Sequence, residues 1–132
     1  LGSYQHGLSV PVTTVDCLNL ERCDLLKADV EGMELDVMRG AAQTLSRFRP
    51  LLYLENDRRE KSPALLEHLL GLGYRLYWHL PPMYNPRNYY GNANNVFPHI
   101  VSVNLLGVHS SIKSNISGLT EVTSPQDFWR HD

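Results

Sequence analysis

The sequence has few cysteines, no excess of basic charge and no long apolar run. Its 132 residues include only Cys17 and Cys23, which form no C-x-x-C pair, and this usage predicts reduced thiols in a cytoplasmic protein. Twelve Lys and Arg against fourteen Asp and Glu give no electrostatic signal for binding nucleic acid or an anionic membrane. No apolar run approaches the roughly 18 residues of a membrane span, and no signal peptide opens the chain.

Common catalytic and metal-binding motifs are also missing. The sequence contains no G-x-G-x-x-G loop, no P-loop, no G-x-S-x-G elbow and no Cys/His nucleophile pattern. Its six histidines include no pair at i, i+3 or i, i+4, so zinc-like spacing is absent and we predict no metal. An oxygen-ligand site for Mg²⁺ or Ca²⁺ built from Asp29, Glu31 and Glu55 is the open alternative.

The hydrophobic patterning predicts one small α/β domain. With 42% apolar and 20% charged residues, the composition is that of an ordinary folded protein with one core. Short apolar runs alternate with stretches of helical periodicity, which is typical of βαβ units. The expected strands are 25–29, 51–55, 74–80 and 100–108, with a short edge strand at 8–12. The expected helices are a turn at 15–20, a long helix from 33 to about 48, and one from Ser62 to about Gly71.

Two stretches lack such patterning. Residues 81–98 are rich in Pro, Asn, Gly and Tyr, and we expect a long irregular loop there. Residues 110–132 are Ser-rich with weak periodicity, and they are interpreted as a tail or a packed-down extension. The chain begins with Leu1 rather than Met, so we expect a fragment or a chain whose natural start is missing.

Carboxylates end or follow the expected strands 25–29 and 51–55. Asp29 closes the run 25–29, and Glu31 and Glu34 follow within one turn of the expected helix start. Groups at the carboxyl ends of parallel strands line the ligand crevice, so Asp29 is a candidate general base, metal ligand or ribose acceptor. Glu31 and Glu34 have a simpler interpretation, since acidic residues in a first helical turn complement the helix dipole. Glu55 occupies the level of Asp29 on the next strand.

Alternatives remain open for the other polar candidates. Glu55 is either a ligand-side carboxylate or the partner of Arg58 or Arg59 in a salt link. His79, at a strand end, is either a proton carrier or a structural residue beside Trp78. The loop residues Asn85, Asn88 and Tyr89 combine amides with an aromatic ring, which suits the hydroxyls and apolar faces of sugars. A turn-rich connector would have a similar composition.

Several spaced blocks resemble the FkbM family of S-adenosylmethionine-dependent methyltransferases. The main blocks are VTTVD at 12–16, LKADVEGMEL at 26–35, VMRGA at 37–41 and RPLLYLE at 49–55. Further similarity lies in YWH at 77–79, NPRNY at 85–89, NVF at 95–97 and VNLLGV at 103–108.

This resemblance implies a fold and a reaction. The family has the class I, Rossmann-like methyltransferase sheet of seven strands with the last antiparallel, and residues 1–109 would supply its last four strands and flanking helices. Family members use S-adenosylmethionine to methylate a hydroxyl of a sugar or natural product. Asp29 would be the base or hydroxyl orienter, supported by Glu31 and Glu34. The substrate-side candidates would be Glu55, His79, Asn85, Asn88 and Tyr89.

The chain departs from the family in its cofactor half. In the family, a glycine-rich loop after the first strand and an acidic residue after the second hold the cofactor, and both lie upstream of the matching blocks. Gly2 and Gly7 follow no strand, so no cofactor-binding residue is assigned. One hypothesis is a C-terminal methyltransferase part that is inactive alone. The other is a non-catalytic ligand-binding or dimerisation module, homodimeric through the exposed edge of strand 25–29, with 8–12 contributing.

Overall fold

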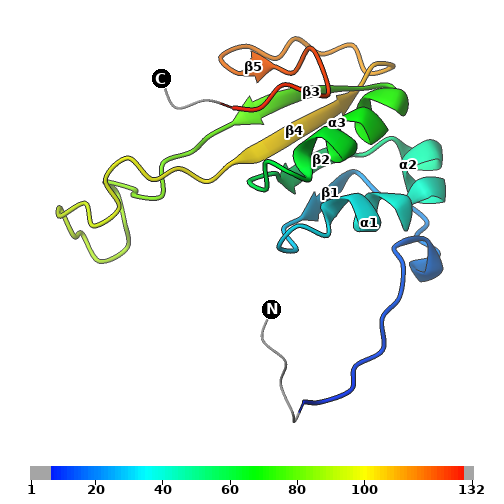
Figure 1. Ribbon diagram of the computed structural model, residues 1–132, viewed down its shortest axis with the longest axis horizontal. Helices are drawn as coiled ribbons and strands as arrows, with labels where there is room; N and C mark the ends of the chain where they lie inside the picture. Colours follow the sequence, from blue (N-terminus) through cyan, green and yellow to red (C-terminus); the bar gives the residue numbers. More distant parts are fainter. Residues whose placement is uncertain (1–6, 130–132) are drawn as a thin grey trace.

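The two apolar runs that end in carboxylates form parallel, neighbouring strands in the computed structural model, which describes residues 7–129. They are β1 (Leu25–Ala28) and β2 (Leu51–Glu55). β3 (Tyr74–His79), β4 (Asn104–His109) and β5 (Thr120–Glu121) complete one sheet in the order β1-β2-β4-β3-β5 (Figure 1). β4 runs antiparallel to both of its neighbours, so the predicted reversal of the last of the four expected strands is confirmed.

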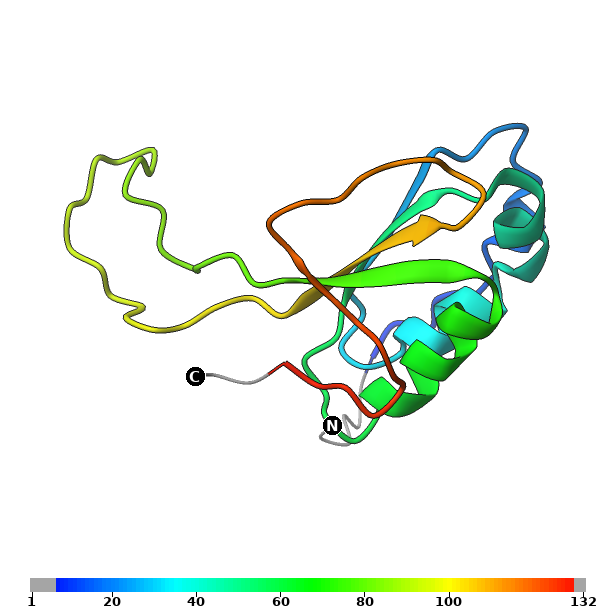
Figure 2. The same ribbon diagram turned by 90° about the horizontal axis from the view of Figure 1, so that it is seen from above.

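Three helices cover one face of this sheet (Figures 1 and 2). They are α1 (Glu34–Arg39), α2 (Ala42–Phe48) and α3 (Ser62–Gly71), and a single 3-10 turn, η1 (Asp16–Leu18), precedes β1. Alternate strand residues such as Leu52, Leu54 and Leu105 point toward the helices and are fully buried. Burial of this apolar face is the main source of the domain's stability. Within residues 7–129, no helix has the length and apolar character needed to cross a bilayer.

The opposite face of the sheet is only partly covered. The segment after β4 crosses it, where the Arg75 guanidinium donates hydrogen bonds to the carbonyl oxygens of Ile112 (3.4 Å) and Ser114 (3.1 Å). Toward β1 the face is open, and Leu25 is 59% exposed. This open face carries every second residue of the strands, including those that lead into the candidate site.

The single helix predicted from 33 to about 48 is wrong, because two helices with a break at Gly40–Ala41 take its place. The carboxylate of Asp16 accepts hydrogen bonds from the amides of Gln43 and Thr44, both at 2.9 Å, and so caps the start of α2. The Asp16 amide in turn donates to the Gly40 carbonyl at 3.0 Å. A Cβ on Gly40 would lie 3.2 Å from Thr14, so this glycine allows close packing against residues 14–16.

Other boundaries also differ from the expectations. Residues 8–12 form no strand, and Leu8 and Val12 are almost fully exposed because no neighbouring strand pairs with them. β4 begins at Asn104 rather than Ile100, and Val101 forms only an isolated bridge to Pro82. Residues 110–129 are packed down rather than a loose tail, because β5 joins β3 and Phe128 packs against the core. Cys17 and Cys23 are free thiols.

Candidate functional site

Four polar side chains lie in a row across the sheet edge where β1, β2 and β3 end. Asp29 follows β1, Glu55 ends β2, Asn104 begins β4 and His79 ends β3. The strand register pairs Glu55 with Asn104 and Asn104 with His79, so these three side chains share one face. Their neighbours Leu54, Leu105 and Trp78 are buried on the helix side, and the row therefore lies on the open face. We call Asp29, Glu55, Asn104 and His79 the strand-end row.

Glu55 has the most perturbed environment in this row. Partial burial raises the pKa of its carboxyl group, and the negative charges of Asp29, Asp57, Glu31 and Glu34 raise it further. Among the described residues, no hydrogen bond or ion pair engages the Glu55 carboxylate. Such a carboxylate retains its capacity to accept a proton from a ligand.

The salt link suggested by the sequence for Glu55 is not formed. Arg58 instead pairs with Glu31 at 2.6 Å and with Asp57 at 3.3 Å. The Arg59 guanidinium carbon lies 5.7 Å from the centre of the Phe128 ring. Neither arginine therefore forms an ion pair with Glu55, although the charges of Arg58 and Glu55 still interact.

The three acidic residues after β1 have different surroundings. Asp29 is half-exposed and pairs with Lys27 at 3.2 Å, on the open face. Glu31 has a left-handed backbone (φ 54°) and points outward to Arg58. Glu34 is buried, and its carboxylate accepts hydrogen bonds from the amides of Val30 (3.0 Å) and Gly32 (3.2 Å). Asp29 thus joins the row, whereas Glu34 holds the turn that positions it.

A tyrosine that the sequence analysis missed contacts the row. The Tyr53 hydroxyl lies 2.8 Å from Nδ1 of His79, and the two rings pack edge to face with centroids 5.7 Å apart. Which group donates depends on the tautomer of the imidazole. Either arrangement fixes the ring and leaves Nε2 of His79 outside this bond. The strand period of two was the available signal, since Tyr53 shares the face of Glu55.

The loop between β3 and β4 does not bring its predicted residues to the row. Residues 81–101 form an arm that projects from the body of the protein (Figures 1 and 2). Asn88 exchanges hydrogen bonds with the backbone of Asn92 at 2.7 and 3.0 Å, and Asn85 accepts one from the Arg87 amide at 2.9 Å. Tyr89 is 95% exposed. The amides thus shape the arm itself.

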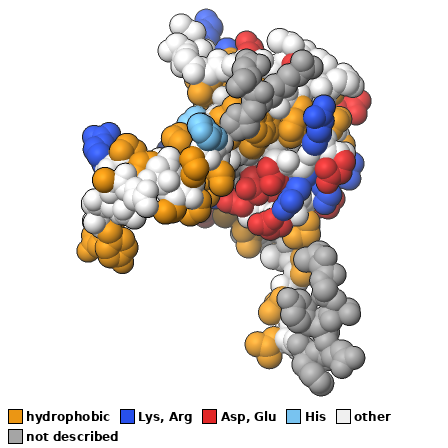
Figure 3. Space-filling model, turned by 60° about the vertical axis from the view of Figure 1, so that its left-hand side comes forward, with side chains coloured by type: hydrophobic (Ala, Val, Ile, Leu, Met, Phe, Trp, Pro, Cys, Tyr) orange, Lys and Arg blue, Asp and Glu red, His pale blue; other side chains and the backbone are white. Residues whose placement is uncertain are grey.

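The surface beside the arm is acidic. Acidic side chains gather near the base of the arm, and the arm itself is largely apolar and uncharged (Figure 3). No group of three or more His, Cys, Asp and Glu side chains within residues 7–129 is arranged to hold a metal ion. The described residues therefore give no support to the Mg²⁺ or Ca²⁺ alternative.

Comparison with known proteins identifies the family. The model of the methyltransferase FkbM domain matches residues 2–76, which is more than half of the 132 residues. No curated protein and no solved structure matches the chain. The matched segment includes Asp29, Glu31, Glu34 and Glu55, whereas His79 and Asn104 lie beyond it. The chain belongs to the FkbM methyltransferase domain family.

Proposed function

We propose that this chain carries the acceptor side of an S-adenosylmethionine-dependent O-methyltransferase. The observation that carries the proposal is the strand-end row, in which Glu55 has a raised carboxyl pKa and no hydrogen bond or ion pair among residues 7–129. Membership of the FkbM family supports methyl transfer as the reaction. The parallel strands β1, β2 and β3 with an antiparallel β4 are consistent with the last four strands of a class I methyltransferase sheet.

In this proposal the residues of the row act on the acceptor hydroxyl. Glu55 accepts the hydroxyl proton, because a carboxylate with a raised pKa is a better general base near neutral pH than an unperturbed one. Asp29 accepts a hydrogen bond from the hydroxyl and orients it, and its negative charge contributes to the raised pKa of Glu55. Nε2 of His79 contacts the acceptor at the other end of the row, with Tyr53 as its positioning residue.

The described residues fit the acceptor better than the cofactor. S-adenosylmethionine would supply the methyl group, and family members hold it with a glycine-rich loop after a strand. Within residues 7–129, no strand is followed by such a loop, so we assign no cofactor-binding residue. We propose that this part is supplied by a further segment that pairs with the free edge of β1, whose ladder within the described chain is formed with β2 alone.

A second candidate function is a homodimerising, non-catalytic module. The observation that favours it is the same free edge of β1, with Leu25 exposed beside it. A bare edge with apolar neighbours is a site for pairing with another chain. Light scattering at tens of micromolar separates the two proposals: the methyltransferase proposal expects a monomer that gains activity on addition of the cofactor half, and the module expects a dimer.

The methyltransferase proposal is tested by restoring a glycine-rich FkbM segment upstream of this chain. Methyl transfer from S-adenosylmethionine to a panel of glycoside hydroxyls should then be measurable, with S-adenosylhomocysteine binding followed by calorimetry. Glu55→Gln should lower kcat by about 100-fold or more, as expected for loss of a general base. The exposed helical variant Glu67→Gln is the matched control and should keep full activity. Unchanged turnover in Glu55→Gln would remove the proposed base, and turnover by the isolated chain would refute the need for a second part.

A further inference from the structure

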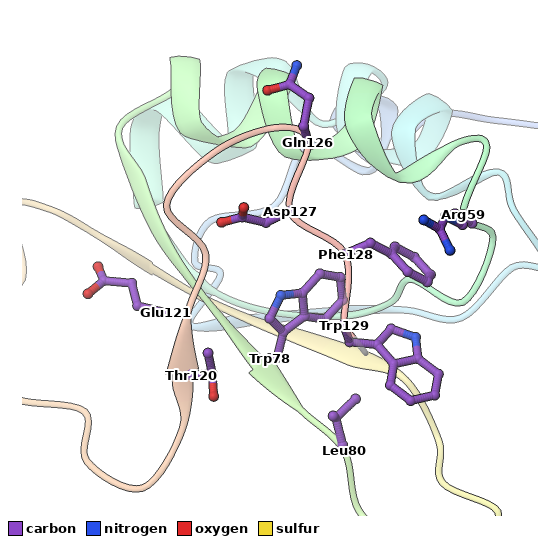
Figure 4. A pocket seen from close by; sticks show the side chains of 9 residues that line it. All are labelled: Arg59, Trp78, Leu80, Thr120, Glu121, Gln126, Asp127, Phe128 and Trp129. Atoms are coloured by element: carbon purple, nitrogen blue, oxygen red, sulfur yellow. The ribbon is translucent and has the colours of Figure 1, made fainter. Parts of the chain in front are cut away.

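A cavity with aromatic walls lies beside the end of β3, under the C-terminal segment. It has a volume of about 430 Å³, within the size range of small-molecule sites. Its lining comes from the loop between β2 and α3, the end of β3, and the segment from β5 to residue 129 (Figure 4). The lining side chains that decide its chemistry are Arg59, Trp78, Glu121, Asp127, Phe128 and Trp129.

Three aromatic rings form one wall of this cavity. Trp78 is almost fully buried and packs edge to face against Phe128, with ring centroids 5.8 Å apart. The centroid of the Trp129 ring lies 6.2 Å from that of Phe128. Phe128 and Trp129 are only partly buried, so they leave aromatic surface for a ligand. Because these rings already pack against one another, little further ordering is needed when a ligand binds.

The Glu121 carboxylate does not face this wall. β5 pairs antiparallel with β3, with Thr120 opposite Trp78 and Glu121 opposite Tyr77. Directly opposite residues share a face of the sheet, so Thr120 lies on the face of Trp78 and Glu121 on the other face. Figure 4 shows the Glu121 side chain directed away from the aromatic rings.

The second carboxylate of the lining is used within the fold. Oδ2 of Asp127 accepts hydrogen bonds from the Thr123 amide (2.7 Å), the Thr123 hydroxyl (2.8 Å) and the Ser124 amide (3.0 Å). These bonds fix the turn before Phe128, so this carboxylate holds the aromatic wall in place.

Arg59 supplies positive charge at the other end of the cavity. Its guanidinium carbon lies 5.7 Å from the centre of the Phe128 ring. Arg59 takes part in none of the ion pairs within residues 7–129, and it is the one basic side chain among the described residues of the lining. In Figure 4, Arg59 lies on one side of the Phe128 ring, and Asp127 and Glu121 lie on the other side. An anionic group beside Arg59 would therefore meet a cation and stay apart from both carboxylates.

This cavity is distinct from the strand-end row. Trp78 and His79 are consecutive residues of β3, so their side chains point to opposite faces of the sheet. Trp78 faces the helices and the cavity, whereas His79 faces the open side with Tyr53. Except for Arg59, the lining residues also lie beyond residues 2–76, the segment that matches the FkbM domain.

We propose that this cavity binds a small aromatic carboxylate. Its ring packs against Phe128 and Trp129, since aromatic pairs gain stability beyond the area that they bury. Its carboxylate accepts hydrogen bonds from the guanidinium of Arg59, whose planar arrangement of donors matches a carboxylate. The inference does not depend on methyl transfer, because neither the strand-end row nor a cofactor takes part in it.

The protein offers a direct optical test. Its only two tryptophans, Trp78 and Trp129, both line the cavity, so intrinsic tryptophan fluorescence of the whole chain reports on this site. Benzoate should give a saturable change with a Kd of about 1 mM, the order expected for a ligand of about ten heavy atoms. Benzyl alcohol keeps the ring but lacks the charge, and it should bind about fivefold or more weakly. N-acetyltryptophanamide under the same conditions corrects for collisional quenching, which does not saturate.

Two arginines provide a matched pair of variants. Arg59→Gln removes the guanidinium from the cavity, so benzoate should bind about fivefold or more weakly while the affinity for benzyl alcohol stays the same. Arg22→Gln makes the same change of charge at an exposed arginine outside the cavity, and it should leave both affinities unchanged. Far-UV and near-UV circular dichroism show whether each variant keeps its fold and its aromatic packing.

Three outcomes would overturn the proposal. The first is the absence of a saturable change with benzoate. The second is benzyl alcohol binding to the parent protein as tightly as benzoate, a comparison that needs no variant. The third is a folded Arg59→Gln variant that binds benzoate as the parent does.

Discussion

Gly107 lies where two neighbouring strands leave little space for a side chain. It lies in the middle of β4, directly opposite Leu52 of β2 and Leu76 of β3. A Cβ built on Gly107 would lie 3.0 Å from the Cβ of Leu52 and 3.3 Å from the Cδ2 of Leu76. The first contact is tighter than most Cβ contacts in folded proteins, and the Cβ of Leu52 cannot rotate away because it is fixed to the backbone of β2.

We therefore expect Gly107→Ala to destabilise the protein. Overpacking a core typically costs about 1–3 kcal/mol. Replacing Gly by Ala returns about 0.4–1 kcal/mol through the lower entropy of the unfolded chain. The net expectation is a loss of about 1–2 kcal/mol in the free energy of unfolding. For a domain of this length, that corresponds to a fall in Tm of about 3–10 °C.

The assay is urea denaturation followed by far-UV circular dichroism, with a thermal melt as a second measure. Gly71→Ala is the control, because a Cβ at Gly71, the last residue of α3, would meet no atom within 4 Å. Helix propensity and chain entropy favour Ala there by about 0.5–1 kcal/mol, so this variant should be more stable than the parent. Gly107→Ala with parental or higher stability would refute the reasoning, since the close approach of β4 to β2 would then be absent in solution.

Three further variants test the cap, the acidic cluster and a buried hydrogen bond. Asp16→Ala removes the cap of α2 and should lower Tm. It should also remove the titration of the Asp16 carboxyl group. Burial raises the pKa of that group, but hydrogen bonds from two amides and a hydroxyl lower it by more, so the net shift is downward. Asp29→Asn should lower the pKa of Glu55 toward its ordinary value, as followed by NMR of the carboxyl carbon. Because that pKa is raised in the fold, stability should fall as pH rises from the ordinary carboxyl value through the raised one, and Glu55→Gln should abolish this dependence. Ser62→Ala leaves the buried Asn56 amide without its 2.8 Å partner and should cost about 1–3 kcal/mol in urea denaturation.

The elements set by local signals were predictable from the sequence. β2 and the start of α3 occur where the apolar run 51–55 and the Ser62–Pro63 pair placed them. These elements depend on hydrophobic runs, a helix-start signal and Pro at the first helical turn, all of which are properties of neighbouring residues. Their boundaries needed no information about the rest of the fold.

The elements set by distant residues were not predictable in this way. The periodicity of 33–48 is continuous, and the break at Gly40 arises from a cap supplied by Asp16, more than twenty residues upstream. β5 has only two residues and forms because β3 offers a free edge. Neither a distant cap nor an available edge leaves a periodic pattern in the sequence.

The residues of the candidate site also divide into those that local sequence reveals and those that depend on distant parts of the fold. Asp29 and Glu55 were found from the sequence because each directly follows or ends an apolar run. Ligands of open α/β sheets bind at the carboxyl ends of the strands, so the position of a residue at a strand end is enough to make it a candidate. The contact between Tyr53 and His79 depends on β4 lying between β2 and β3, which brings residues 26 positions apart to 2.8 Å. The sequence order of the strands does not reveal that insertion.

The match to the FkbM domain ends at residue 76, within β3, and so divides the strand-end row. The two carboxylates proposed to act on a hydroxyl, Asp29 and Glu55, lie within the segment that matches the FkbM domain. His79 and Asn104, the other two members of the row, lie beyond that segment. Exchange of the part after residue 76 between members of the family should therefore alter acceptor binding through His79 and leave Asp29 and Glu55 in place. Such an exchange is constrained by Gly107, since a side chain at this point would crowd Leu52 and Leu76.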